Sequence, residues 1–214
     1  MNFGSVVSVN VATPTEIAVD GGTVLTSIFK APVEGRVAVR RNNIAGDEQS
    51  DLTVHGGPHK AVYCYPEEHY SFWREQVPDM RLVPPMFGEN LTTRGLSEEE
   101  INIGDQLRVG SALLQVTQPR MPCYKLGIRF GRVDIVKRFW VSGRPGIYFS
   151  VIEEGEVAAG DPIERISSAK DGISVADVVA LFRGKKKSPD LLERALRAPL
   201  FGGWKEGLRE RRSS

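Results

Sequence analysis

One cysteine of this chain stands where a thiol can do chemistry. Cys123 closes the stretch QPRMPC, residues 118–123, which follows the apolar run ALLQVT. The prolines in the stretch restrict the backbone and favour extended geometry before them, so we expect the thiol to be held rigidly at the end of a strand. Arg120, together with Lys125, favours the thiolate, which is the form that attacks electrophiles and binds soft metals. A small buried core cysteine is an equally good interpretation of these residues alone.

The second cysteine has a different setting. Cys64 lies inside the alternating run AVYCY, which contains no charged residue, and this favours a buried structural role. Two cysteines cannot build a disulfide framework for a chain of 214 residues, so we interpret both as free thiols.

A further group of polar residues surrounds the turn HGGPHK. His55 and Lys60 flank residues 56–58, a Gly-Gly-Pro turn between two apolar runs, and such a turn can bring both side chains to one mouth of the fold. His55 suits ligand orientation, proton donation or metal binding, and a hydrogen-bonded turn histidine is an equally good interpretation. We predict His59 at the surface and His69 at the surface or half-buried. The spacing of the three histidines does not match a zinc pattern.

The stretch FGENL carries Glu89 and Asn90 directly after Gly88. Glycine permits a tight turn, and the two polar side chains supply a carboxylate and an amide just before a strand-like run. An ordinary polar turn explains the same residues, so spacing alone leaves both interpretations open.

Short apolar stretches with β-branched residues, separated by glycine turns, dominate the chain up to residue 166. Many short strands with irregular connections predict a mainly β fold, a β-barrel. The predicted strands include residues 23–29, 35–40, 60–65, 105–109, 111–118 and 146–152. Helical spacing of apolar residues predicts two helices that pack on the barrel, at 66–77 and 133–143.

The pattern becomes helical in the last part of the chain. Amphipathic runs predict three short helices at residues 174–184, 188–199 and 202–212. Ser174 and Ser188 are the expected N-caps of the first two. We therefore predict a barrel domain at 1–166 and a small three-helix bundle at 167–214.

Charge is distributed unevenly along the chain. The formal net charge is +1, but the residues from Lys170 onward contain 11 Lys and Arg against 6 Asp and Glu, a net of +5, which leaves −4 for the rest. A nearly neutral protein has no general attraction for nucleic acid or anionic lipid. The run at 185–187, three lysines, fits a solvated loop better than a docking patch. No stretch approaches the ~18 apolar residues that span a bilayer, and no signal peptide is recognisable, so we expect a cytoplasmic protein.

The motifs are more specific together than alone. In this order, HGGPHKAVYCY, FGENL, IGDQLRV and QPRMPC resemble the MOSC family, the domain named after the C-terminal part of molybdenum cofactor sulfurase. The resemblance covers residues from about 26 to 166 and is greatest for the stand-alone, YiiM-like branch. The three-helix tail resembles the 3-alpha extension of that branch.

The resemblance implies a β-barrel that binds molybdenum cofactor, a molybdopterin, with Cys123 as the protein ligand to molybdenum. Lys30 and Arg36 match the cations that hold the pterin phosphate in related proteins, and Arg120 offsets the charge of the anionic cofactor. The other residues that match the family's motifs are His55, Lys60, Glu89 and Asn90.

The YiiM-like branch also implies an activity, the molybdenum-dependent reduction of N-hydroxylated compounds such as hydroxylaminopurine base analogues. The oxygen leaves as water, so the site needs two electrons and a proton donor. His55 is the candidate donor, and Lys60 or Lys30 would orient it or bind phosphate. The sequence has neither a cysteine cluster motif nor a GxGxxG fingerprint, so we expect electrons from a separate flavin or iron–sulfur reductase.

Other functions stay open at this point. A carrier of molybdenum cofactor or sulfur, with Cys123 as a persulfide acceptor, would use the same residues. An adaptor built on the basic tail is a third function, but the interleaved acids and few aromatics of the tail offer no stacking platform for nucleic acid. A homodimer paired through the tail is also left open.

Overall fold

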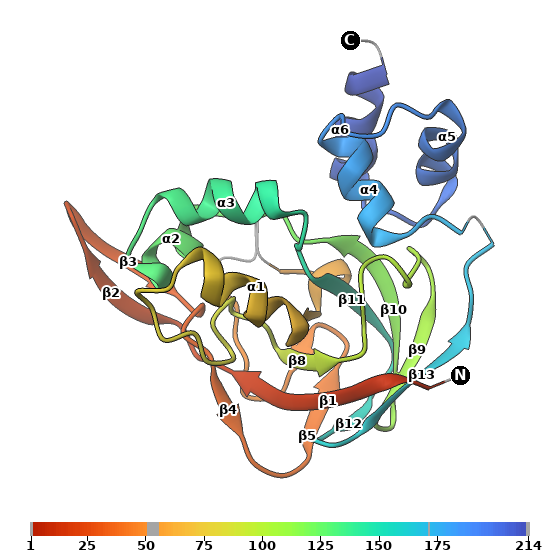
Figure 1. The fold of residues 1–214 in the computed structure, drawn as a ribbon. Coiled ribbons are helices and arrows are strands. Elements are labelled where there is room, and N and C mark those ends of the chain that lie inside the picture. The colour runs from red at the N-terminus through yellow and green to blue at the C-terminus, as the bar shows by residue number, and fades with distance from the viewer. Residues whose placement is uncertain (1, 51–55, 171, 213–214) are drawn as a thin grey trace.

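A closed β-barrel forms the centre of the protein. The computed structural model describes residues 2–50, 56–170 and 172–212. Within these residues seven strands close the barrel, in the order β13 (Pro162–Ser167), β9 (Gln106–Val109), β10 (Ala112–Pro119), β11 (Ile147–Glu153), β7 (Val62–Pro66), β8 (Leu91–Arg94) and β1 (Asn2–Val11) (Figure 1). Closure comes from β1, which pairs with β8 on one side and β13 on the other. The predicted mainly β fold with a barrel is therefore confirmed.

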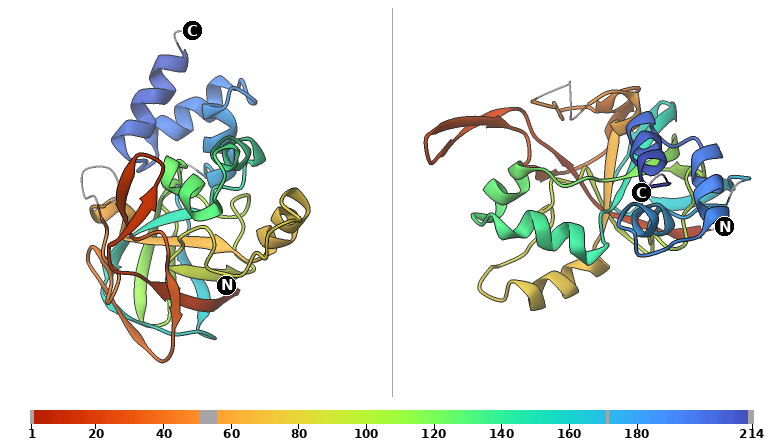
Figure 2. Two further views of the ribbon diagram at one scale, coloured as in Figure 1. Left: turned by 90° about the vertical axis from the view of Figure 1, so that its left-hand side faces the viewer. Right: turned by 90° about the horizontal axis from the view of Figure 1, so that it is seen from above.

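The remaining strands lie outside the closed ring. β4 (Ala31–Val33) pairs with β1, and a small sheet contains β12 (Gly155–Val157), β5 (Val37–Arg40) and β6 (Asn43–Ile44). A hairpin of β2 (Thr15–Val19) and β3 (Gly22–Thr26) projects away from the barrel (Figures 1 and 2). β7 and β8 run parallel, whereas the other pairs around the barrel are antiparallel, so the sheet is mixed.

Three helices lie together beside the barrel. They are α1 (Glu68–Gln76), α2 (Tyr124–Phe130) and α3 (Asp134–Ser142) (Figure 1). They bury an aromatic cluster in which the Tyr65 and Phe87 rings stack at 4.3 Å and the Trp73 ring lies 6.0 Å from Phe139. The indole of Trp73 donates a hydrogen bond of 2.7 Å to the Tyr65 hydroxyl, so its polar atom is satisfied. α1 and α3 confirm the two predicted packing helices; α2 was not predicted.

The tail forms the three predicted helices, α4 (Val175–Phe182), α5 (Pro189–Arg197) and α6 (Gly202–Arg212), at one end of the barrel (Figure 2). The Ser174 hydroxyl accepts a hydrogen bond of 3.0 Å from the Asp177 N–H, and the Ser188 hydroxyl accepts one of 3.3 Å from the Leu191 N–H. Both predicted N-caps are confirmed. None of the helices in the described parts of the chain is long and apolar enough to cross a bilayer.

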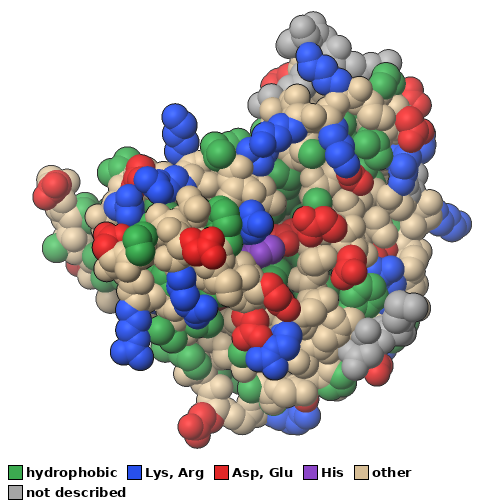
Figure 3. Space-filling view, in the orientation of Figure 1, with side chains coloured by type: hydrophobic (Ala, Val, Ile, Leu, Met, Phe, Trp, Pro, Cys, Tyr) green, Lys and Arg blue, Asp and Glu red, His purple; other side chains and the backbone are tan. Residues whose placement is uncertain are grey.

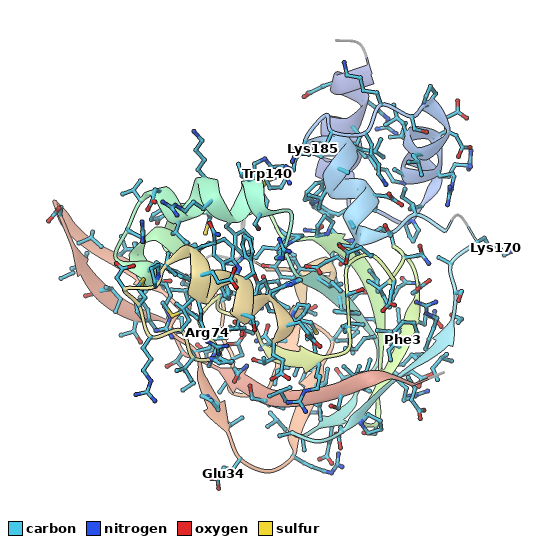
Figure 4. All side chains as sticks on the ribbon, in the orientation of Figure 1. Phe3, Glu34, Arg74, Trp140, Lys170 and Lys185 are labelled. Carbon is cyan, nitrogen blue, oxygen red and sulfur yellow. The ribbon has the colours of Figure 1, made fainter. Side chains whose placement is uncertain are left out.

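The barrel and the tail share one hydrophobic core. Val178 and Trp204 of the tail belong to the same buried cluster as Leu114 and Phe149 of the barrel. Trp140 of α3, at the junction with the tail in Figure 4, has its ring 5.9 Å from that of Phe182 and 6.4 Å from that of Trp204. The tail therefore covers an apolar face of the barrel, and the division of the chain near residue 166 stays a prediction.

Candidate functional site

Five of the predicted site residues meet at one hollow with a volume of about 100 Å³. They are Lys30, Lys60, Asn90, Arg120 and Cys123. Lys60 ends the short 3₁₀ helix η1 (Pro58–Lys60), Asn90 directly precedes β8, and Arg120 directly follows β10. Segments that are far apart in sequence therefore supply one site.

Cys123 lies at the junction of β10 and α2. Its backbone is extended (φ −124°, ψ 170°), and it occupies the N-cap position of α2. The side chain is partly exposed and lines the hollow. Cys64 differs: it is 2% exposed, and burial raises the pKa of its thiol, so the thiol stays protonated. The predicted burial of Cys64 is confirmed.

The hollow is rich in cations, namely Lys30, Lys60, Arg120 and Lys125. Arg120 is 7% exposed, donates a hydrogen bond to the Phe87 carbonyl and lies 4.7 Å over the Tyr63 ring. The ammonium of Lys125 donates a hydrogen bond of 2.7 Å to the Ser50 hydroxyl. These contacts fix both charges at the wall of the hollow.

Lys30 and Lys60 differ in their surroundings. Lys30 forms an ion pair with Asp47, and both side chains are buried. Burial lowers the pKa of Lys30, while the charge of Asp47 opposes this shift. Asp47 also accepts a hydrogen bond of 2.8 Å from the Asn90 amide, so the ion pair is held from a second side. Burial lowers the pKa of Lys60 as well, which makes its ammonium a better proton donor than an exposed lysine.

Three residues of the FGEN motif, Gly88, Glu89 and Asn90, have different roles in the structure. Gly88 has a φ of +71°, and a Cβ there would lie 2.8 Å from the Ile28 side chain, so glycine is required at this turn. Asn90 faces the hollow and accepts a hydrogen bond of 3.1 Å from the Tyr63 N–H. Glu89 is fully buried and is not among the lining residues.

The carboxylate of Glu89 organises the interior behind the hollow. It accepts hydrogen bonds from the Tyr70 hydroxyl (2.5 Å), the Phe87 N–H (3.0 Å) and the Thr92 hydroxyl (3.1 Å). Burial raises the pKa of Glu89, and these hydrogen bonds reduce that shift. The structure therefore places Glu89 as a support of the site, whereas the motif predicted a cofactor contact.

We expect Glu89→Ala to lower the free energy of unfolding by about 3 kcal/mol, because three buried donors lose their acceptor. Glu48→Ala is the matched control, since Glu48 is exposed at the hollow and the change should cost under ~0.5 kcal/mol. Chemical denaturation measures both values. Equal stability of the two variants would contradict the supporting role of Glu89.

Arg36 lies away from the hollow. Its guanidinium donates hydrogen bonds of 3.1 and 2.9 Å to the two carboxylate oxygens of Asp161, and its side chain is 54% exposed. The structure thus pairs Arg36 with Asp161 and does not bring it to the other predicted site residues.

The histidines have separate environments. His55, the predicted proton donor, lies outside the described residues. His59 is exposed, as predicted, with its ring 5.3 Å from the Phe201 ring. His69 is half-buried, also as predicted, and its Nε2 lies 2.8 Å from a carboxylate oxygen of Glu98.

Three polar lining residues that the sequence did not single out are Asp47, Tyr63 and Tyr148. Asp47 lies in the stretch GDEQSD just before the HGG motif, and neither its type nor its spacing identified it as a site residue. Tyr63 and Tyr148 lie opposite each other on β7 and β11, with their rings 4.9 Å apart. The strand alternation that buries Cys64 turns Tyr63 to the other face, so the tyrosine could have been found once the pairing of the two strands was known.

The chemical types of the residues that line the hollow suit an anionic cofactor that carries a soft metal. Cys123 supplies one soft donor, so the cofactor itself would supply other ligands to a metal there. The four cations outnumber the lining acids, Asp47 and Glu48. The buried hydroxyl of Ser27 also lines the hollow and has no hydrogen-bond partner within the described residues. A polar ligand would satisfy it.

Known proteins resemble this chain over nearly its whole length. The family model described as MOSC domain matches residues 51–164. Protein YiiM of Escherichia coli (strain K12) is 38% identical over 192 residues, which cover 88% of this chain and 85% of that protein. The crystal structure of YiiM from Geobacillus stearothermophilus has a TM-score of 0.80 and 30% identity, and the match covers 97% of this chain and 98% of that one.

A larger protein contains a similar part. A protein of Gibberella moniliformis (strain M3125 / FGSC 7600) that is named reductase is 34% identical over 184 residues, which cover 84% of this chain and 32% of the fungal protein. The MOSC model spans more than half of the present chain, and the similarity to YiiM extends over the barrel and into the helical tail. The chain therefore belongs to the MOSC domain family, with YiiM proteins among its homologues.

Proposed function

We propose that this MOSC protein is a molybdenum-cofactor-dependent reductase of N-hydroxylated small molecules. The observation that carries the proposal is the hollow that gathers the partly exposed thiol of Cys123, four cationic side chains and the hydroxyl of Ser27, which has no partner among the residues that the structure describes. A thiolate is a suitable ligand for a soft metal, and cations suit a phosphate-bearing pterin. The similarity to a larger protein named reductase is compatible with redox chemistry.

Different residues of the hollow would bind different parts of the cofactor. Cys123 would be the ligand to molybdenum. Arg120 and Lys125, fixed by their hydrogen bonds, would face the anionic parts of the cofactor. Lys30 is already paired with Asp47, so its charge is partly compensated before any ligand binds. We therefore assign Arg120 and Lys125 the larger share of the attraction for a phosphate.

The reaction itself sets the chemical requirements. Reduction breaks the N–O bond, consumes two electrons and two protons, and yields an amine or imine nitrogen and water. When bound, the cofactor would supply the two electrons at its metal. Lys60 lines the same hollow as Cys123, and burial lowers the pKa of its ammonium, so Lys60 can pass a proton to the departing oxygen. A separate flavin or iron–sulfur reductase would replace the electrons.

Protein made in a host that produces molybdenum cofactor tests this proposal. We expect molybdenum and pterin to copurify with the chain, and reduced viologen to drive the reduction of an aromatic hydroxylamine. Bound cofactor without turnover would favour the cofactor or sulfur carrier, with Cys123 as persulfide acceptor. Protein that neither holds cofactor nor reduces hydroxylamines would overturn the proposal.

We expect the protein that donates the electrons to bind at the basic tail. Lys185, Lys186 and Lys187 are exposed in the turn between α4 and α5, where Lys185 is labelled in Figure 4. The ammonium of Lys186 lies 2.5 Å from Asp177 in a half-exposed ion pair, which contributes little to stability. An acidic donor protein would be attracted to this turn.

Changing the three lysines to glutamine should therefore slow donor-driven turnover. We expect the effect mainly at low salt, because the Debye length falls from ~30 Å at 0.01 M to ~10 Å at 0.1 M. Activity with reduced viologen should be unchanged. Arg36→Gln, Arg40→Gln and Arg41→Gln together, in and beside β5 and far from the tail in Figure 1, remove the same number of positive charges and control for net charge. If the donor-driven and the viologen-driven rates fall together, or neither rate changes, the three lysines are not the docking site.

A further inference from the structure

A second hollow, with a volume of about 270 Å³, lies between the barrel and the tail. It adjoins the first hollow, because both are lined by Lys60, Met121, Cys123 and Tyr148. The tail supplies the opposite wall through Phe182, Phe201, Gly203 and Trp204. In Figure 3 a notch lies between the outer part of the tail and the helices beside the barrel, although Trp140 of α3 contacts the tail at its base. The thiol of Cys123 thus lies where a cation-rich space meets an aromatic one.

The aromatic wall of the second hollow combines a buried ring, that of Trp204, with an exposed ring, that of Phe201. Trp204 is 5% exposed, and its ring lies 4.8 Å from that of Phe182 at an interplanar angle of 64°. Phe201 is 41% exposed, and the ammonium of Lys60 lies 5.8 Å from its ring centre. A flat ring entering this space would find an aromatic surface already in place.

One buried polar atom in this second hollow lacks a partner. Gln118 is 2% exposed, and its Oε1 accepts no hydrogen bond from the described parts of the chain. A buried acceptor without a donor is energetically unfavourable. A ligand that donates an N–H group to Oε1 would remove this cost and be stabilised by the hydrogen bond. The hollow therefore combines a stacking surface with one acceptor.

We propose that the second hollow binds the flat, N–H-bearing heteroaromatic part of the substrate and directs its N-hydroxyl group toward Cys123. This inference rests on the proposed reductase function and assigns to the tail a direct part in substrate selection. Phe201 and Trp204 stack on the ring, and Gln118 accepts its N–H. The volume is close to the lower end of the ~300–1,000 Å³ of small-molecule sites, which suits one ring or two fused rings.

Gly203 provides the most direct test. A Cβ at Gly203 would meet only the Phe201 ring, at 3.7 and 3.9 Å, which are ordinary contacts. A larger side chain therefore fits the backbone and occupies the hollow, and helix propensity favours it over glycine. Gly202→Leu is the matched control, because Gly202 lies next along α6, does not line the hollow and has nothing near its Cβ position.

We expect Gly203→Leu to raise KM for 6-hydroxylaminopurine and phenylhydroxylamine at least ~10-fold, and to leave KM for N-methylhydroxylamine unchanged. Gly202→Leu should change none of these values. Gln118→Leu should raise KM for the purine, which carries N–H donors, more than for phenylhydroxylamine, whose ring has none. If Gly203→Leu affects the aliphatic and aromatic compounds equally, or neither, the proposed ring site is wrong although the reductase function stands.

A binding measurement separates this inference from the proposed function. Calorimetry with adenine, which cannot be reduced at an N–O bond, should show binding to the cofactor-loaded protein and to Gly202→Leu, with affinity at least ~10-fold weaker for Gly203→Leu. Adenine binding without turnover of any hydroxylamine would support the ring site and overturn the reductase function. No adenine binding to the unchanged protein would overturn the ring site. Should Gly203→Leu fold poorly, Phe201→Ala removes an exposed ring and makes the same test.

Discussion

Cys123→Ser is expected to abolish the reduction of N-hydroxylated compounds and to weaken the retention of molybdenum. A serine hydroxyl is a hard donor that stays protonated near neutral pH, so it cannot replace a thiolate at a soft metal. The extended backbone of Cys123, at the N-cap position of α2, is available to serine, so the fold should persist. Metal analysis and viologen-driven turnover, expressed per bound molybdenum, measure the two losses.

Cys64→Ser is the matched control, because it makes the same chemical change at a buried cysteine. We expect it to retain activity and to lower the free energy of unfolding by about 1–3 kcal/mol, the cost of burying a hydroxyl that lacks a partner. Iodoacetamide provides a readout that does not depend on turnover: cofactor-free protein should be labelled at the partly exposed Cys123 and not at Cys64. Equal loss of activity per molybdenum in both variants would remove Cys123 from its assigned role.

The sequence predicts the elements whose signals are local. Ser174 and Ser188 mark helix starts because a hydroxyl at the N-cap binds the backbone three residues on, and both do so in the structure. α2 escaped prediction because its seven residues follow directly on the proline-rich motif and include Gly127. Closure of the barrel depends on the pairing of Asn2 with Glu164 at opposite ends of the barrel sequence, and no local pattern encodes such a pairing.

The candidate site is predictable only in part, because a motif identifies residues without showing where their side chains point. Asn90 faces the hollow, whereas its neighbour Glu89 turns inward to bind Tyr70. Arg36 matches a family pattern and yet pairs with Asp161. The second hollow could not be predicted without knowing how the tail packs on the barrel, because only the fold brings Phe201 and Cys123 to the same space.

Lys60→Met is expected to lower kcat by roughly 10²-fold, the usual share of a general acid, while most of the molybdenum is retained. Methionine keeps the length and apolar stem of lysine but carries no proton. Lys60→Arg separates proton donation from charge, because a guanidinium stays protonated far above neutral pH and gives up no proton. We expect Lys60→Arg to retain the cofactor, as Lys60→Met does, and not to restore the rate.

The pH dependence of kcat provides the decisive readout for Lys60. A proton donor must be protonated to act, so its contribution is fully present below its pKa and is lost as the pH rises through that value. Burial lowers the pKa of Lys60 from 10.5, so the loss should begin at a lower pH than for an exposed lysine, and Lys60→Met should lack it. If Lys60→Arg recovers the full rate, Lys60 acts through its charge alone. If His55→Ala removes the alkaline loss and Lys60→Met leaves it unchanged, then the proton comes from His55, because the group that titrates is the group that donates.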